Sequence, residues 1–75
     1  MAWLTDWSAA GLRNTLSEAR AERGLTQEAL AELVGVSRKT INTVERGRFV
    51  PSTILALKLA RVLRVPVEQL FSLRR

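Results

Sequence analysis

The sequence predicts a small all-α fold of five helices, and three observations lead to this prediction. Apolar residues recur at spacings of three and four, which is the period of an amphipathic helix. Glycine, proline, serine or threonine stands between these apolar segments, where helices are expected to begin and end. No segment shows the strict alternation of apolar and polar residues that indicates a strand. With 75 residues, the chain has the length of one compact domain.

The five helices are expected at residues 12–22, 27–33, 38–45, 52–63 and 67–71. In the first of them, Leu12 and Leu16 lie one turn apart, and Gly24 is placed to end the helix. Residues 1–11 form an N-terminal extension without a clear helical pattern, so residues 12–75 make up the predicted domain.

Hydroxyl side chains stand at the expected starts of three helices. The oxygens of Thr26, Ser37 and Ser52 are each placed to accept a hydrogen bond from a backbone N–H in the first helical turn. Gly35 and Gly47 follow the second and third helices, where glycine commonly ends a helix. These local signals predict most of the helix boundaries.

The charge balance and the missing residue types limit the function. The chain has 12 basic and 7 acidic residues, a net charge of +5, which favours a polyanionic partner such as DNA, RNA or an acidic membrane. It has no cysteine and no histidine, which removes thiolate metal sites, the commonest metal ligand and the commonest general base. We therefore expect a protein that is not an enzyme and needs no metal or cofactor.

No segment is apolar for long enough to span a membrane, and the N-terminus lacks the features of a secretory signal. A cytoplasmic protein is therefore expected. The basic residues Lys58, Arg61 and Arg64 recur at roughly helical spacing, which leaves open a helix that lies on a membrane surface. A core helix with one solvated face explains the same spacing better, so no membrane partner is expected.

The segment QEALAELVGVSRKTINTVER, residues 27–46, has the residue types that two steeply crossing helices require. Ala31 is small where the helices meet, and Gly35 permits the positive backbone φ of a sharp turn. Ile41 and Val44 are spaced to anchor the later helix to the core. The pattern predicts a helix-turn-helix formed by the second and third helices.

With those apolar residues inward, the outward face of the third helix is rich in hydrogen-bond donors and poor in carboxylates. Its residues are Ser37, Arg38, Lys39, Thr40, Asn42 and Thr43. Such a face suits the DNA major groove, where base edges present acceptors and arginine or lysine pairs with guanine. The alternative is a charged face that is merely solvated, and the neighbouring turn makes this the weaker interpretation.

The stretch LTQEALAELVGVSRKTINTVERGRFVPS resembles the Cro/cI, or XRE-type, helix-turn-helix family of transcriptional regulators. The resemblance covers residues 12–71 and its motifs, T-Q-E-x-L-A and G-V-S-x-x-T-I among them, are highly specific. It implies a compact lambda-repressor-like domain of five helices whose third helix enters the major groove of double-stranded DNA. The pair Thr53-Ile54 departs from the family, which commonly has the apolar residue first.

The resemblance also implies roles for single residues. Contacts to bases are expected from Arg38, Lys39, Thr40 and Thr43. Contacts to the DNA backbone are expected from Gln27, Ser37, Asn42, Arg46 and Arg48. The family often pairs the position of Glu45 with an arginine at that of Arg20. A carboxylate beside DNA repels phosphate unless the protein neutralises it, so we expect a structural Arg20–Glu45 ion pair.

One helix reads only about four to six base pairs, so a unique site requires two copies on half-sites one DNA turn apart. We therefore expect a homodimeric regulator, in the role of a repressor, on a two-fold symmetric operator. The expected dimer interface is formed by Val65, Val67, Leu70, Phe71 and Leu73. In the alternative, Leu70 and Phe71 only complete the monomer core.

Two features lie outside the family pattern. Trp3 and Trp7 of the extension are of a residue type enriched at interface hot spots. A protein partner bound through the extension, as in an antitoxin, is therefore the main alternative function. Ile54 is expected to be exposed unless the tryptophan segment or a second subunit covers it, or unless a shifted helix buries it.

Overall fold

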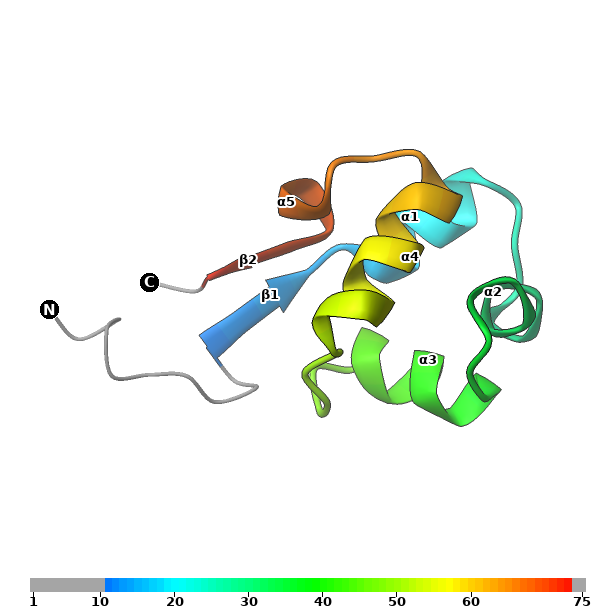
Figure 1. Cartoon of the computed structure of the whole chain (residues 1–75), viewed down its shortest axis with the longest axis horizontal. Coiled ribbons are helices and arrows are strands. Elements are labelled where there is room, and N and C mark those ends of the chain that lie inside the picture. Colours follow the sequence, from blue (N-terminus) through cyan, green and yellow to red (C-terminus); the bar gives the residue numbers. More distant parts are fainter. Residues whose placement is uncertain (1–10, 74–75) are drawn as a thin grey trace, which may run out of the picture.

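The computed structural model describes residues 11–73, which fold into five helices and a short two-stranded sheet (Figure 1). The elements in chain order are β1 (Leu12–Asn14), α1 (Leu16–Glu22), α2 (Gln27–Val34), α3 (Arg38–Glu45), α4 (Thr53–Leu63), α5 (Val67–Leu70) and β2 (Phe71–Leu73). The five helices were predicted, whereas the sheet was not. The expectations that concern Trp3 and Trp7 lie outside the described residues.

The expectation of an all-α fold is correct for the five helices but not for the whole domain, because β1 and β2 pair as antiparallel strands (Figure 1). Leu12 lies opposite Leu73, and the N–H of Thr15 continues the contact by donating to the carbonyl of Leu70. Each strand has three residues, which is too short for the alternating pattern that identifies strands in a sequence. Their partners are also far apart along the chain, so no local signal announces the pairing.

The start of the first helix was also placed too early. The chain is extended from Leu12 to Asn14, and α1 begins at Leu16. The side-chain oxygen of Asn14 accepts a hydrogen bond from the N–H of Leu16 at 3.2 Å, which satisfies a backbone donor in the first turn. The change from strand to helix therefore occurs at an asparagine, a residue type that favours such local bonds.

Every helix contributes to one apolar core. Its fully buried members include Leu16, Leu30, Ile41, Leu59, Leu63 and Leu70. Two of them come from α4, which lies between the helix-turn-helix pair and the α5–β2 segment (Figure 1). A small domain buries little apolar surface, so a single core shared by all five helices is its main source of stability.

The three helix starts predicted from hydroxyl residues are confirmed. The side chains of Thr26, Ser37 and Ser52 each accept a hydrogen bond from the N–H three residues later, at the start of α2, α3 and α4. The C-terminal end of α4 is less regular, because Arg64 has a positive φ of 59°. Arg23 covers this end by donating from Nε to the carbonyl of Leu63 at 2.9 Å.

Candidate nucleic-acid interface

α2 and α3 form a tightly connected helix pair. Gly35 ends α2 with φ 78° and ψ 34°, the left-handed conformation that the sequence required at this turn. The N–H groups of Gly35 and Val36 both donate to the carbonyl of Ala31, at 2.9 and 3.0 Å. Ala31, Ile41 and Val44 are buried, so the inward faces of both helices are fixed against the core.

The outward side of α3 lies along the lower edge of the molecule in Figure 1. Arg38 and Lys39 are exposed at the start of the helix, and Ser37 is exposed at its N-cap. Thr40, Asn42 and Thr43 are half-buried. The structure thus brings together, on α3 and its N-cap residue, the four residues expected at bases and two of those expected at phosphates.

Two of these hydroxyl groups already have partners within the protein. Thr43 donates from Oγ1 to the carbonyl of Lys39 at 2.6 Å, which leaves its lone pairs and its methyl group available to a base. The hydroxyl oxygens of Ser37 and Thr40 lie 3.0 Å apart, and that of Ser37 also accepts from the N–H of Thr40. Arg38 and Lys39 therefore remain the strongest exposed donors on this face.

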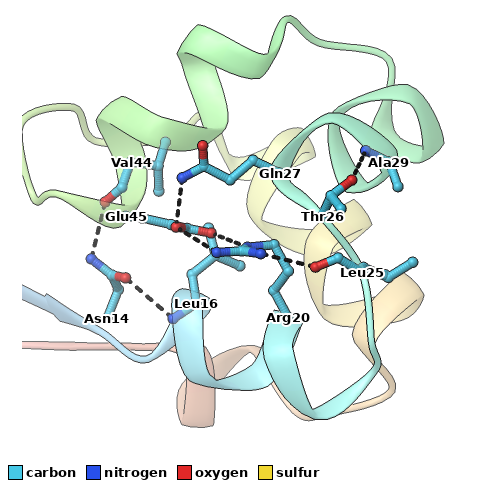
Figure 2. Close-up of polar contacts among 9 residues, drawn as sticks. All are labelled: Asn14, Leu16, Arg20, Leu25, Thr26, Gln27, Ala29, Val44 and Glu45. Atoms are coloured by element: carbon cyan, nitrogen blue, oxygen red, sulfur yellow. Dashed lines mark hydrogen bonds and ion pairs between the residues drawn. The ribbon is translucent and has the colours of Figure 1, made fainter.

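A three-way junction at Glu45 fixes α3 to the rest of the domain (Figure 2). Arg20 of α1 donates to both carboxylate oxygens, from Nε to Oε2 at 2.6 Å and from Nη2 to Oε1 at 3.3 Å. Gln27 of α2 donates from Nε2 to Oε1 at 2.9 Å. Arg20 also reaches the carbonyl of Leu25 through Nη1 at 2.8 Å. One carboxylate thus connects three helices.

The junction removes Glu45 from the surface that would meet a phosphate. The Glu45 side chain is 7% exposed and that of Arg20 is 18% exposed. The ion pair expected from the resemblance is therefore present, and it neutralises the single acid of the segment 37–48. The basic side chains of that segment, Arg38 and Lys39 among them, are left without a competing carboxylate on α3.

Gln27 has a partner within the protein that the sequence did not predict. It is expected to contact the DNA backbone, and one N–H of its side-chain amide is directed at Glu45 (Figure 2). Its amide oxygen is an acceptor and does not bond a phosphate oxygen. The amide nitrogen carries two N–H groups, so one can donate to Glu45 while the other donates to a phosphate, and the bond leaves the expected backbone contact open.

Arg46 and Arg48 are both exposed where α3 ends, as expected for residues that face phosphates. Sequence reasoning missed Asn14, which donates from Nδ2 to the carbonyl of Val44 at 3.1 Å (Figure 2). This bond fixes the last turn of α3 from the strand β1. Its only sequence signal is a polar residue on what seemed an amphipathic helix, because the two partners are distant along the chain.

Among residues 11–73, no cluster of acidic residues, histidine or cysteine is suited to hold a metal ion. No helix within that range is both long and apolar enough to cross a membrane. The features that the described residues do present are a fixed pair of crossing helices and a basic outward helix face. These features define a helix-turn-helix protein of the DNA-binding class.

Comparison with known proteins agrees with this class. The pattern of the HTH_3 family, described as helix-turn-helix, matches residues 16–70. An HTH-type transcriptional regulator from Methanothermobacter thermautotrophicus is 52% identical over 63 residues, which cover 83% of this chain and 91% of that protein. A regulator of the same type from Bacillus subtilis, YgzD, is 42% identical over 60 residues, which cover 80% and 91%.

The fold is also similar to that of solved structures. The restriction-modification controller protein C.AhdI from Aeromonas hydrophila is 41% identical and superimposes with a TM-score of 0.67, over 72% of this chain and 82% of that one. A Bacteroides fragilis protein described as DNA-binding has a TM-score of 0.74 at 31% identity, over 81% and 98%. The chain therefore belongs to the HTH_3 family of XRE, or Cro/cI, type and is a transcriptional regulator, not an enzyme.

Proposed function

We propose that this regulator is a repressor that binds a two-fold symmetric operator as a homodimer, with α3 in the major groove. The observation that carries the proposal is the outward face of α3. Exposed donors begin that face, and the only carboxylate of the helix is held by Arg20 and Gln27. A donor-rich helix of this kind suits the acceptors of guanine and adenine in the major groove.

The proposed division of labour follows from position along the helix. Arg38, Lys39, Thr40 and Thr43 read bases. The arginine and the lysine are exposed in the first turn, which is the part of a recognition helix that meets base edges. Ser37, Asn42, Arg46 and Arg48 flank that set and contact the DNA backbone, as does Gln27 at the start of α2. Such contacts fix the position of the protein and supply salt-dependent affinity.

The experiment that tests the proposal is selection of bound duplexes from a random DNA library by the full chain. A two-fold symmetric site with half-sites about one helical turn apart is the expected product. Placing that site over a promoter in a reporter assay should lower transcription. Enrichment of no sequence, or of a site without symmetry, would contradict the proposal, as would a rise in transcription.

A further inference from the structure

The C-terminal end of α3 closes in a tight turn just before Arg48. The N–H of Gly47 donates to the carbonyl of Val44 at 3.0 Å, and the N–H of Arg48 donates to the carbonyl of Thr43 at 3.0 Å. Gly47 has a φ of 74°. These two bonds around a left-handed glycine form the Schellman motif, a common end of helices. The turn therefore decides where the exposed side chain of Arg48 starts from.

Asn14 holds this turn from outside the helix (Figure 2). Its Nδ2 donates to the carbonyl of Val44 at 3.1 Å, so that carbonyl accepts from Asn14 and from Gly47 at once. Its Oδ1 accepts from the N–H of Leu16 at 3.2 Å. A backbone carbonyl only accepts and a backbone N–H only donates, which determines the orientation of the amide. One side chain thus joins the first turn of α1 to the last turn of α3.

Asn14 is itself held by the elements on both sides of it. In β1 it lies opposite Phe71 of β2. The N–H of the next residue, Thr15, donates to the carbonyl of Leu70 at 3.0 Å, and its Oγ1 donates to the carbonyl of Gln69 at 2.8 Å. The bond to α3 therefore starts from a residue that the two-stranded sheet and α5 keep in place.

This bond differs from the ion pair that also holds α3. Arg20 binds the side chain of Glu45, whereas Asn14 binds the main chain of the preceding residue, Val44. Only the carbonyl of Val44 is part of the turn that leads to Arg48. The two contacts therefore fix the helix and its terminal turn separately.

We infer that Asn14 is a positioning residue for DNA binding, which holds the end of α3 so that Arg48 meets a phosphate. This inference rests on the proposed function, in which α3 lies in the major groove and Arg48 contacts the DNA backbone. A side chain on a fixed turn loses less conformational freedom on binding than one on a loose turn. Asn14 has no charge of its own and acts through the position of Arg48.

The bonds of Asn14 involve none of the apolar side chains that bear on the proposed homodimer. Ile54 is 68% exposed and α4 begins at Thr53, so the idea that a shifted helix buries Ile54 is wrong. Leu70 is only 1% exposed and belongs to the monomer core, so its side chain does not reach a partner as the sequence led us to expect. Replacing Asn14 should therefore leave the oligomeric state unchanged, which sedimentation of the full chain measures.

The test compares Asn14→Ser with a matched control, Thr15→Val, in the full chain. Serine keeps an oxygen near the N–H of Leu16 but is too short to reach the carbonyl of Val44. Valine has nearly the shape of threonine, and it removes the neighbouring bond to Gln69 without a change at α3. The side chain of Thr15 makes no cap bond, so α1 keeps its start. Circular dichroism should show that both variants are folded at the temperature of the binding assay.

N14S should weaken binding to the selected duplex and to a scrambled one alike, by about fivefold. It should also reduce the slope of log affinity against log salt by up to about 1, as expected when one phosphate contact is lost. T15V should bind as the unchanged chain does. An N14S variant that binds as tightly as T15V would overturn the inference.

Double variants distinguish a positioning role from a general loosening of the fold. If Asn14 acts through Arg48, N14S/R48A binds no more weakly than R48A alone, because the positioned group is already gone. In N14S/R38A the two losses should multiply, because Arg38 lies at the opposite end of α3. Losses that multiply in both double variants would show that Asn14 does not act through Arg48, and the inference would be wrong.

Failure of the proposed function has its own readouts. Selection would then enrich no symmetric duplex, or R48A would bind as tightly as the unchanged chain, and the second result would overturn the inference as well. Phosphate contacts carry no sequence information, so the variants can be compared on a scrambled duplex even without a selected site. If R48A weakens binding there and N14S does not, only the inference about Asn14 is wrong.

Discussion

Arg20 and Glu45 meet side-on, with Nε and Oε2 only 2.6 Å apart, and this contact joins α1 to α3 across 25 positions of the chain. The Glu45 side chain is nearly buried, and Gln27 shares one of its oxygens. Removal of one member of such a pair leaves the other charge without compensation. The contact therefore helps to hold α3 in place, together with the buried Ile41 and Val44 of the same helix.

Glu45→Ala should lower the free energy of unfolding by about 3 kcal/mol, because Arg20 and Gln27 then lose their acceptor. Asn42→Ala removes a half-buried side chain of the same helix and should change the free energy of unfolding by about 0.5 kcal/mol or less. Urea unfolding of the two variants measures both values. Equal midpoints would show that the junction contributes no stability of its own.

Ser52→Ala should cost about 1 kcal/mol, because the N–H of Leu55 loses the acceptor that closes the first turn of α4. Ser72→Ala is the control, since Ser72 is exposed on β2 and caps no helix. Thermal unfolding of both variants, followed by circular dichroism, gives the comparison. A melting temperature for S52A that matches that of S72A would count against the cap.

Arg64→Gly should raise the free energy of unfolding by about 0.5 kcal/mol. A side chain at a positive φ costs about 1–2 kcal/mol, and glycine removes this cost. Glycine also raises the conformational entropy of the unfolded chain, which offsets part of the stabilisation. Arg61→Gly, within α4, should instead lower the free energy by about 1 kcal/mol. Denaturant titration reports the two signs, and a loss of stability in R64G would contradict the argument from backbone strain.

Arg38→Ala and Arg48→Ala should affect DNA binding in different ways. R38A should relax one base position in each half-site and weaken binding to the selected site by about 1–3 kcal/mol. R48A should weaken binding to all sequences and reduce the slope of log affinity against log salt by about 1. Titration of the selected duplex and of a scrambled one distinguishes the two roles. Arg13→Ala, an exposed arginine of β1, serves as the control for loss of charge.

The parts of the fold that the sequence predicted are those with a local cause. Thr26, Ser37 and Ser52 each bond a backbone N–H three residues away, so their type and position are enough to predict a helix start. Gly35 is equally local, because the turn that it permits lies at the residue itself. The pairing of β1 with β2 depends on distant segments, and so do the bonds of Asn14 and Gln27.

For the site, the sequence identified which residues α3 presents, because helical spacing decides which side chains face the core. It did not predict that Gln27 has a protein partner, since that requires the relative position of two helices. The dimer interface expected from the sequence shows the same division. Leu70 has the apolar character of an interface residue and of a core residue alike, and only the packed structure distinguishes them.

The pairing of Leu12 with Leu73 has a consequence for how the protein is made. Among residues 11–73, β1 is synthesised before the five helices and β2 after them, so the strand that pairs with β1 is missing during most of synthesis. The helices form from local contacts and need not wait, whereas contacts between distant segments form slowly. The bond from Asn14 to Val44 lies at the end of that first strand. The pairing of β1 with β2 therefore forms only after translation has passed Leu73, whereas the bond from Asn14 to Val44 needs no residue of β2.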